Sequence, residues 1–565
     1  MKLRTSFFNF GVLRKNLTRF APLWILFAIG EVLGIMSLDV TNLAYRIVDD
    51  LSYIMGPVSI FHAGYALLVA ACLFGDLFDA RLCNGLHAMP MRREGWLLTN
   101  LVSGLVFALI PAIVGGGFAA IVLQEYWWIA IAWQLVSLLQ FVFFFGVAVF
   151  SALCAGKRIG MIAIYGILNF LSQLIYWAAT KIYEPLLPGV VIGNDWYELF
   201  SPLVTMVGSM YYDIDINWSE ISTKVVFNGY IMESWYYLYA CAAVGLVFTG
   251  LGWLLYRKRH LETAGDFISF RPMRIFFLIA YTLAAGVVLY SFGDLIGVYT
   301  NYGFLVVGLL IGWFTGWMLL ERTIKIFNKK VIAGLAVFAL LFVGSIGLTI
   351  ADPLGIVARV PKAQEIESVC LYPMQNTYMY YSTAYDSGRY VSAPEEVALV
   401  QELHRQMLET PESADDEIIN IELRYQLKNG AYVYRSYDVP AQSEAAENLR
   451  PFLSDTRSVF ATNDWQQVKD DLMGVHVYPA ADKESFEISD ANLQQALLNA
   501  IEADCKAGNF AQHDYFHRYQ EYVAGIDITW KTDSTGRSPN ARNEHVIVYA
   551  DCVNTVAFLE TLDEN

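Results

Sequence analysis

Long apolar runs fill the first 350 or so residues of this chain, and no other feature constrains its fold as strongly. A helix needs about 20 apolar residues to cross the hydrocarbon core of a bilayer. Backbone amides in lipid find partners only within their own segment, so runs of this length must be helices. The sequence therefore predicts a polytopic α-helical membrane protein with about nine transmembrane helices. The expected spans are residues 20–38, 56–78, 97–123, 128–154, 159–180, 235–256, 274–293, 301–320 and 331–350.

Charge is divided along the chain as unevenly as hydropathy. Charged residues make up only 16% of the sequence, which is less than a soluble protein of this length carries. Residues 1–350 hold 22 Lys and Arg against 19 Asp and Glu, whereas residues 351–565 hold 16 against 35. The net charges are therefore +3 and −19, which together give the −16 of the whole chain. The acidity belongs to a separate C-terminal domain.

Basic residues indicate which way the spans run, because Lys and Arg gather in cytoplasmic connections. With the N-terminus in the cytoplasm, the inner connections hold 19 Lys and Arg. The outer connections hold only Arg46, Lys181 and Lys224. We therefore expect a multi-pass protein of the cell membrane, with a cytoplasmic N-terminus and residues 351–565 outside the cell.

The C-terminal domain reads as an acidic α+β domain. Alternating apolar residues in 418–439 surround an Asn429-Gly430 turn, which predicts a β-hairpin with one buried face. Ser392 and Glu395 have capping-box spacing and predict the start of a helix over 392–409. A second helix is expected over 490–506. Further strands are expected at residues 366–372, 525–531 and 545–550.

Two properties of this domain leave alternatives open. Its net charge of −19 could attract cationic peptides, or could serve only to keep the surface solvated. Its three cysteines, Cys370, Cys505 and Cys552, allow one disulfide, which the sequence does not assign. The role of the domain therefore stays open at this point.

Three segments between the spans have a character of their own. Residues 1–19 contain an amphipathic stretch that predicts a helix lying along the inner membrane surface. The inner connection 78–96 is basic and contains one proline, which suits either a plain loop or a protrusion on which a cytoplasmic ATPase acts. The outer segment 181–234 is long and half apolar, and predicts a re-entrant or surface-lying helix pair or a small outer subdomain.

This layout resembles the permease subunit of a bacterial ABC-type exporter. The stretch LFGDLFDARLCNGLHAMPMRREGW, residues 73–96, is similar to the region that such permeases present to their ATPase. The stretch YRKRHLETAGDFISF, residues 256–270, resembles the segment after the sixth span in a branch with additional helices and a C-terminal outer domain. The resemblance implies a six-helix transmembrane domain over 20–256, additional helices over 257–350 and an extracellular domain over 351–565.

The same resemblance implies partners and a coupling loop. The partners would be cytoplasmic ABC ATPase subunits, a second permease copy or paralogue, and the lipid bilayer, with no nucleic acid. The substrate would be amphipathic or peptide-like, which suggests drug or antimicrobial-peptide export or resistance. The residues expected at the ATPase-coupling loop are His87, Met89, Pro90, Arg92 and Arg93.

We expect no enzymatic activity in this chain itself. The phosphate-binding pattern GxxxxGK[ST] does not occur, so ATP and Mg²⁺ would be bound by a separate ATPase, and we expect no cofactor on this chain. His513, His517 and Glu521 have helical spacing for a Zn²⁺ site. An ordinary aromatic helix explains them as well, and we predict no metal site and no catalytic residue.

Polar residues inside the spans are the remaining candidates. Glu31 lies near the middle of the first span, where a carboxylate is costly, so it should face the helix bundle. It would be either a substrate or gating contact or a hydrogen-bonded contact between helices. Gly308, Gly312 and Gly316 share one helical face, which predicts close helix packing within the chain or between two copies.

Two other classes of protein compete with the permease. A membrane sensor or signalling protein with an extracellular ligand-binding domain would need no ATPase. A membrane-anchored metallopeptidase would need zinc on the outer domain. The sequence alone does not determine the substrate, the direction of transport, or whether two permeases in a dimer are identical.

Overall fold

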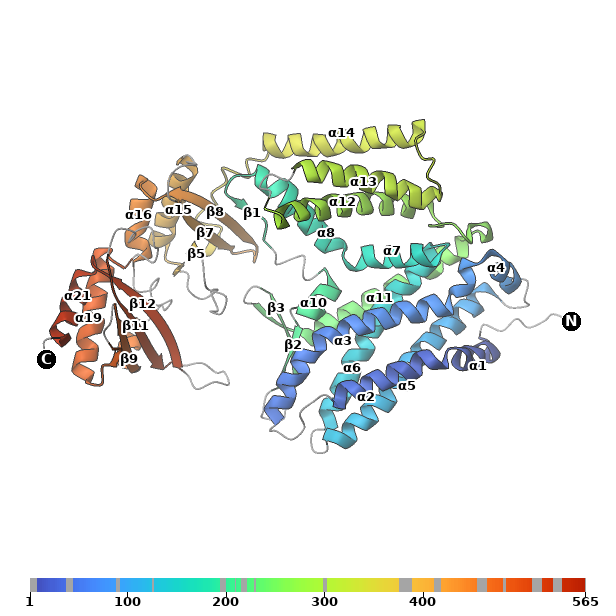
Figure 1. The fold of residues 1–565 in the computed structure, drawn as a ribbon, viewed down its shortest axis with the longest axis horizontal. Coiled ribbons are helices and arrows are strands. Elements are labelled where there is room, and N and C mark those ends of the chain that lie inside the picture. The colour runs from blue at the N-terminus through green and yellow to red at the C-terminus, as the bar shows by residue number, and fades with distance from the viewer. Residues whose placement is uncertain are drawn as a thin grey trace. The chain divides into compact units, whose positions relative to one another are not determined.

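The structure is a computed structural model, and Figure 1 shows its elements in chain order. The chain forms two compact units, which are described separately. The first comprises residues 1–182 and 194–345, and the second comprises residues 183–193 and 346–565. The structure describes residues 8–36, 44–87, 92–123, 127–193, 200–208, 210–214, 221–227, 230–297, 302–374, 389–410, 418–454, 465–480, 484–510, 521–531 and 541–563.

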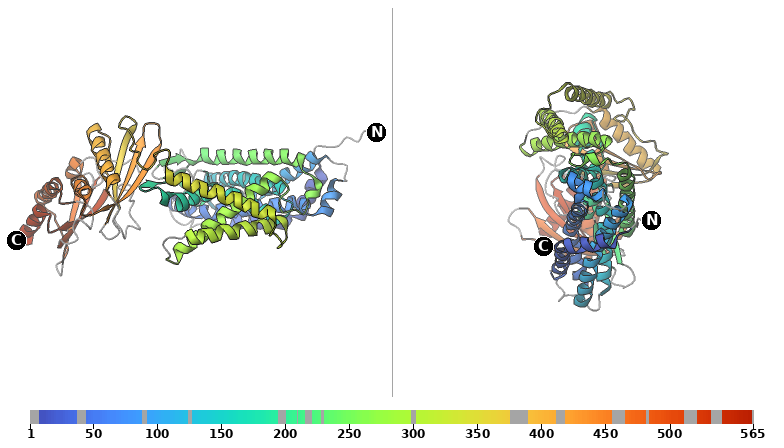
Figure 2. Two further views of the ribbon diagram at one scale, coloured as in Figure 1. Left: turned by 90° about the horizontal axis from the view of Figure 1, so that it is seen from above. Right: turned by 90° about the vertical axis from the view of Figure 1, so that its right-hand side faces the viewer.

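The first unit is a bundle of long apolar helices. Seven helices in the described residues are long and apolar enough to cross a membrane, and two further pairs, each bent by 61°, bring the number to nine if each pair is one span. The seven are α3 (Ala44–Leu73), α5 (Arg93–Leu123), α6 (Trp127–Cys154), α11 (Ser234–Lys258), α12 (Arg271–Leu295), α13 (Tyr302–Glu321) and α14 (Lys329–Ala351). Figures 1 and 2 show α3, α5, α6 and α11 running nearly side by side.

The two bent pairs explain how the remaining expected spans are built. Helix α1 (Phe10–Arg19) precedes α2 (Ala21–Met36), so the amphipathic leader and the first span form one bent pair. Helix α7 (Arg158–Asn169) precedes α8 (Leu171–Ala178), which continues through a π-helical turn at Ala179–Tyr183 into a 3-10 turn at Glu184–Leu186. The polytopic helical class predicted from the sequence is confirmed.

Helix α6 occupies the centre of the bundle because small residues let its neighbours approach closely. A Cβ atom on Gly146 would lie 2.0 Å from the backbone oxygen of Gly245, and one on Gly245 would lie 2.6 Å from the Cα of Phe143. The backbones of α6 and α11 therefore touch, as small residues allow in membrane helices. Helix α5 crosses on another side, where Gly104 lies beneath the ring of Phe145.

The three glycines singled out on α13 lie against α12 of the same chain. A Cβ on Gly308 would lie 2.6 Å from the backbone oxygen of Ala285. A Cβ on Gly312 would be about equally close to the side chain of Ala285 and to the backbone of Thr282. A Cβ on Gly316 would contact the side chain of Leu278. All three contacts are within the chain, so these glycines allow α12 and α13 to pack closely.

In its described residues, the outer segment 181–234 matches the small subdomain that the sequence left open rather than a pair of helices. These residues include a short helix, α10 (Pro202–Gly208), followed by an antiparallel sheet of β2 (Met210–Ile214), β3 (Ile221–Phe227) and β4 (Tyr230–Glu233). The β-branched residues of β3 favour a strand over a helix, which overrides the apolar character of the preceding run. Residues 183–193 leave this segment and join the second unit.

The second unit contains two antiparallel sheets covered by helices, so the predicted α+β class is confirmed. The first sheet has the order β1-β8-β7-β5-β6, with helices α15 (Pro394–Glu409) and α16 (Glu444–Leu453). Its strands are β1 (Val190–Val191), β5 (Ile366–Met374), β6 (Arg389–Val391), β7 (Ile418–Leu427) and β8 (Tyr432–Pro440). Strands β7 and β8 form the predicted hairpin, and Gly430 in its turn has a φ of +81°.

The start of helix α15 differs from the sequence prediction by one residue. The N-cap of α15 is Ala393, not Ser392, and the Ala393 side chain makes no capping hydrogen bond. Pro394 occupies the first helical turn, where its fixed φ and missing N–H are well tolerated. The proline therefore sets the start of the helix, one residue later than the capping-box pattern suggested.

The second sheet has the order β10-β9-β11-β12. It is covered by α18 (Trp465–Asp470), α19 (Ala491–Ala507) and α21 (Val553–Asp563). Asp490 caps α19 through its side chain, and Gly508 ends that helix with a φ of +84°. Its strands are β9 (Leu472–Pro479), β10 (Phe486–Glu487), β11 (Tyr522–Lys531) and β12 (Ala541–Tyr549).

The two halves of this unit repeat one another. Each runs strand, short strand, helix, strand, strand, helix, and pairs its four strands antiparallel in the same spatial order. The first strand of each half reads alike, with Val369-Cys370-Leu371-Tyr372-Pro373 matching Val475-His476-Val477-Tyr478-Pro479. We call residues 366–453 the first repeat and residues 472–563 the second repeat. Strand β1 adds a fifth strand to the first repeat alone.

Candidate functional site

A buried arginine forms hydrogen bonds to several of the connections that the charge pattern predicts to be cytoplasmic. Arg259, just after α11, is only 5% exposed. Its guanidinium donates to the backbone oxygen of Leu77 at 3.1 Å and to those of Ala152 and Leu153 at 3.3 and 3.0 Å. These carbonyls belong to the end of α6 and to the 3-10 turn after α3, so one side chain links three spans.

The chain after Arg259 is also joined to the α6–α7 connection through its backbone. The N–H of Gly265 donates to the oxygen of Gly156, and the N–H of Ser269 donates to the oxygen of Cys154, both at 2.8 Å. A Cβ on Gly160 would lie 2.0 Å from the oxygen of Phe267, so only glycine fits there. The stretch 256–270 is therefore a packed part of the bundle rather than a free loop.

Ion pairs connect the additional helices to the same end of the bundle. Arg322, which follows α13, contacts Asp266 at 2.6 Å, and Arg274 contacts Glu321 at 3.1 Å. At the other end, Lys181 contacts Asp294 at 3.1 Å. The contacts thus sort the connections into the same two groups that the distribution of basic residues predicted.

The predicted coupling loop lies beside the buried arginine. Its short helix α4 (Ala80–His87) begins at Asp79, whose carboxylate accepts the backbone N–H groups of Arg81 and Leu82. His87 is the last residue of α4, and Met89 and Pro90 lie outside the described residues. Arg92 and Arg93 are exposed, and the Arg93 guanidinium reaches the backbone oxygen of Arg259 at 3.4 Å.

Glu31 is the centre of a buried polar cluster between helices. The side chain is 4% exposed, and each of its two carboxylate oxygens has partners. One oxygen lies 3.2 Å from Nε2 of His62. The other accepts from the indole N–H of Trp133 at 3.0 Å and from the amide of Gln134 at 3.3 Å. The carboxylate thereby joins α2, α3 and α6.

The cluster continues across the bundle as a chain of hydrogen bonds. Nδ1 of His62 lies 2.7 Å from the side-chain oxygen of Gln140, whose amide nitrogen donates to Ser59 at 3.0 Å. The Ser59 hydroxyl donates to the backbone oxygen of Met206 in α10 at 3.4 Å. The chain therefore links the middle of the first span to the short helix of the outer segment.

This geometry places one proton between His62 and Glu31. When the Gln140 amide donates to Ser59, its oxygen accepts from Nδ1 of His62, and two bare acceptors at 3.2 Å would repel each other. If the Gln140 amide is turned over, its nitrogen donates to Nδ1 of His62 instead. Neutral His62 then donates from Nε2 to the Glu31 carboxylate. In both arrangements a proton lies between the two side chains, which keeps them paired inside the membrane.

Glycines on α5 make room for this cluster. A Cβ on Gly115 would lie 3.0 Å from the Cβ of Glu31, and one on Gly116 would lie 2.9 Å from Cγ of Gln134. Within the described residues, the buried side-chain oxygens of Gln134 and Ser137 have no hydrogen-bond partner. The Gln134 amide also bonds to the Glu31 carboxylate, so its second polar atom is the unpaired one nearest to the cluster.

The leader helix is also fixed by buried polar contacts. Asn16 of α1 is 8% exposed and donates to Asn100 at 2.8 Å and to Ser103 at 3.0 Å, both on α5. The backbone N–H of Asn9 donates to Thr99 at 3.1 Å. Helix α1 is therefore docked against the start of α5, next to the predicted coupling loop.

The first repeat of the second unit carries a polar cluster in its core. His404 lies between two tyrosine hydroxyls, with Tyr425 2.9 Å from Nδ1 and Tyr437 2.8 Å from Nε2. Burial, together with nearby Arg435 and Arg405, lowers the pKa of His404 from 6.5 to about 3. The ring is therefore neutral at physiological pH, with one nitrogen donating and the other accepting.

Arg435 in this cluster holds chain segments that come from the membrane spans. Its guanidinium donates to the backbone oxygens of Ile356 and Arg359 at 2.8 and 3.1 Å, and both follow α14. Strand β1 pairs with β8 at the same point, with Val190 opposite Arg435. Gln401 adds a bond of 2.6 Å to the oxygen of Pro361. The first repeat thus holds both connections to the spans.

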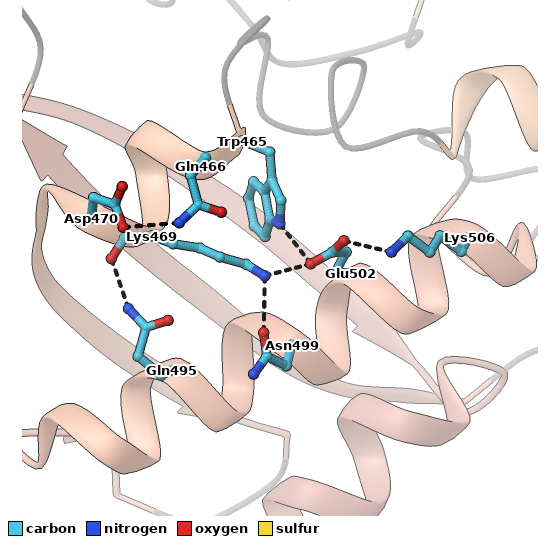
Figure 3. Close-up of polar contacts among 8 residues, drawn as sticks. All are labelled: Trp465, Gln466, Lys469, Asp470, Gln495, Asn499, Glu502 and Lys506. Carbon is cyan, nitrogen blue, oxygen red and sulfur yellow. Dashed lines mark hydrogen bonds and ion pairs between the residues drawn. The ribbon is translucent and has the colours of Figure 1, made fainter.

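The second repeat is braced by the contacts shown in Figure 3. The Glu502 carboxylate of α19 pairs with Lys469 of α18, accepts from the indole N–H of Trp465 at 3.2 Å, and pairs with Lys506 at 2.6 Å. Lys469 also donates to Asn499 at 2.9 Å. The two lysines lower the pKa of Glu502 to about 2. The carboxylate therefore stays charged and holds α18 on α19.

The metal and cysteine hypotheses have different outcomes. His513 and His517 lie outside the described residues, so the structure says nothing about that pattern. Among the described residues, no group of three His, Cys, Asp or Glu side chains could hold a metal ion. All the cysteines are free thiols, and no disulfide joins them. Cys370, Cys505 and Cys552 of the second unit are buried.

Several members of these sites were missed in the sequence, for an identifiable reason. His62, Ser59 and Trp133 lie in apolar runs and show no spacing with Glu31, because their contacts cross between helices. Arg259 was counted only as one basic residue of a cytoplasmic connection. A charged residue directly after a span, surrounded by other basic residues, carries no sign that it will be buried.

Searches of family models, curated proteins and solved structures return no significant match to this chain. The helices and the two repeats therefore define its class by themselves. It is a multi-span membrane protein with seven to nine spans and a C-terminal α+β region.

Proposed function

We propose that the chain is the membrane-spanning subunit of an ABC-type exporter, driven by a separate ATPase chain. The observation that carries this proposal is the position of Arg259. A short exposed helix, α4, lies next to a turn whose Leu77 carbonyl is held by this buried guanidinium. An ATPase that moves α4 would therefore act on the ends of α3, α6 and α11 at once.

Two further features support this function. The leader helix α1 is docked on α5 at the same end of the bundle, which adds a second surface beside α4. Hydrogen bonds from Glu31 to Met206 link the first span to the outer segment through α3. A shift of α3 would therefore displace both the first span and α10. Alternating access requires helices that move as linked bodies.

The substrate we propose is amphipathic or peptide-like. The resemblance of residues 73–96 and 256–270 to exporter permeases suggests this class, and a second copy or a paralogue would complete the pathway. In this arrangement the C-terminal α+β domain lies outside the cell and the coupling loop inside it, as the basic residues predict.

The proposal is tested by copurification. Affinity-tagged chain is expressed in its own host with its neighbouring genes, and copurifying proteins are identified by mass spectrometry. We expect a P-loop ATPase in the wild-type preparation. Reversing the charges of Arg92 and Arg93 to Glu should reduce its recovery by tenfold or more, because both side chains are exposed beside α4.

The matched control reverses two other basic residues of the inner connections. Lys325 and Lys329 are exposed and far from α4 in the chain, with Lys325 between α13 and α14 and Lys329 at the first position of α14. Their reversal to Glu should leave ATPase recovery unchanged. Equal loss in both double variants would mean that general charge, not the loop, recruits the ATPase.

A membrane sensor with an extracellular ligand-binding domain is the alternative function. It is favoured by the way the first repeat holds both chain segments that lead from the spans. A ligand on the domain could then signal through the spans without an ATPase. If no P-loop ATPase copurifies under any expression condition, this alternative replaces the exporter.

A further inference from the structure

One face of the second repeat carries an unusual set of exposed side chains. Residues Val475, Val477, Ile526 and Val546 point into the core beneath the helices. Because side chains alternate along a strand, the residues between them lie on the opposite face. Tyr478 lies on that face and is 40% exposed. Tyr522 is 42% exposed, and its hydroxyl reaches the same face because the strand has an irregular register between Tyr522 and Ala524.

Asp527 lies in the middle of this face, with aromatic side chains around it. One carboxylate oxygen contacts Nδ1 of His545 at 2.6 Å, and the other accepts from the Tyr478 hydroxyl at 3.3 Å. Partial desolvation and this carboxylate raise the pKa of Tyr478, so the hydroxyl remains a donor. Asp527 is 25% exposed and keeps lone pairs for a further donor.

The rings form a row next to the carboxylate. The ring centroids of His476 and Tyr478 are 4.6 Å apart, and those of Tyr478 and His545 are 6.3 Å apart. The Tyr522 hydroxyl bonds to the backbone oxygen of Tyr478 at 3.4 Å. Cations are attracted to the faces of aromatic rings, and a carboxylate among such rings strengthens that preference.

Gly525 leaves room for the His545 ring beside Asp527. A Cβ on Gly525 would lie 2.6 Å from Cε1 and 2.9 Å from Nε2 of His545, and 3.3 Å from the Tyr522 hydroxyl. The imidazole therefore lies directly over Gly525. A larger residue at this position would push the His545 ring away from Asp527.

The first repeat shows that the fold does not require these residues. The strand pairing aligns Asp527 with Arg424, because each lies opposite the equivalent residue of the first strand, His476 or Cys370. The same register aligns Gly525 with Glu422. The charge at the centre is thus reversed in the first repeat, and the small residue is replaced by a carboxylate.

We propose that this face of the second repeat is a binding site for an organic cation, with Asp527 as the counter-ion and the rings of Tyr478, Tyr522 and His545 around it. The ligand is an ammonium or guanidinium group, borne either by a basic peptide or by a lipid headgroup. The site would give the acidic domain, with its net charge of −19, one defined place for a cationic ligand.

The site is tested on the full-length protein in an uncharged maltoside detergent, without an ATPase, because a cationic peptide would bind anionic lipid by itself. Binding of a fluorescein-labelled peptide of alternating Lys and Leu is measured by anisotropy, and competition with soluble dihexanoyl phosphatidylcholine below its micelle concentration distinguishes the two sources. We expect saturable binding. Asp527→Asn and Tyr478→Ala should each raise the dissociation constant by tenfold or more.

The matched control removes one negative charge elsewhere in the same repeat. Glu484 is exposed, and Glu484→Gln should change the dissociation constant by less than twofold. Non-saturable binding, or equal weakening by Asp527→Asn and Glu484→Gln, would overturn the proposal in favour of general charge attraction. Displacement by the phosphocholine competitor identifies a headgroup site, and its failure identifies a peptide site. Because no ATPase is present, the result is independent of the copurification experiment.

Discussion

At the scale of single residues, the buried charges in the described part of the chain have several partners each. Glu31 has three side-chain partners from two other helices, and Arg259 has three backbone carbonyls. Such groups are expensive to leave unpaired in a membrane. Each therefore fixes the relative position of the helices that supply its partners.

Replacing Glu31 tests this role directly. Glu31→Leu leaves the donors of Trp133 and Gln134 buried without an acceptor, which should cost about 3 to 5 kcal/mol. Glu31→Gln keeps the shape and one acceptor and should cost about 1 to 2 kcal/mol. The midpoint temperature of thermal unfolding, measured on purified protein in detergent, should therefore be highest for wild type, lower for Glu31→Gln and lowest for Glu31→Leu. A Leu variant as stable as wild type would show that the carboxylate is kept for something other than packing.

At the scale of elements, polar pairs on the surface of the second repeat attach one helix to another. The Glu502 carboxylate connects α18 to α19 through Lys469, as Figure 3 shows. Its pKa is lowered from 4.5 to about 2, so the folded state favours the charged form. The stabilisation is therefore complete above about pH 4.5 and is lost as the pH falls toward 2.

Glu502→Gln should abolish this pH dependence. The variant should lose about 1 to 2 kcal/mol at pH 7, after allowance for partial solvent exposure, and almost nothing at pH 2. The measurement is hydrogen exchange of residues 465–470, which should exchange faster in the variant at neutral pH only. Glu484→Gln, which removes an exposed carboxylate outside this cluster, serves as the control. An equal effect at both pH values would show that packing, not charge, holds α18.

At the scale of the whole molecule, the arrangement of basic residues is a strong constraint. The Arg259, Arg322 and Arg274 contacts all join connections expected on one side, and Lys181 joins two on the other. The alternation of spans is thus consistent with the contacts between them.

Cysteine labelling of intact cells tests the predicted orientation. A membrane-impermeant maleimide should label Lys428→Cys, at the exposed hairpin of the first repeat, without permeabilisation. It should label Arg92→Cys only after the membrane is opened. The native cysteines, which are buried except for the partly exposed Cys72, provide the background measurement in unmodified protein. The reverse pattern would invert the topology and remove the coupling loop from the cytoplasm.

Much of the fold follows from local patterns, whereas the sites do not. Span length, the Asn429-Gly430 hairpin and the face shared by Gly308, Gly312 and Gly316 depend on neighbours in the chain, so they are readable in the sequence. The partners of Glu31 come from helices more than 30 residues away, and Asp527 gains its surroundings from strand register. The repeat was missed because its two copies share topology and buried positions more than residue identity.

The short strand β1 has a mechanical consequence. Two chain segments that follow membrane spans meet in the first repeat at a single residue. Arg435 lies opposite Val190 of β1 and donates to the backbone oxygens of Ile356 and Arg359, which follow α14. A ligand that displaced the Arg435 side chain would therefore loosen both segments together. One of these segments comes directly after the π-helical turn Ala179–Tyr183, and such turns occur frequently at functional sites.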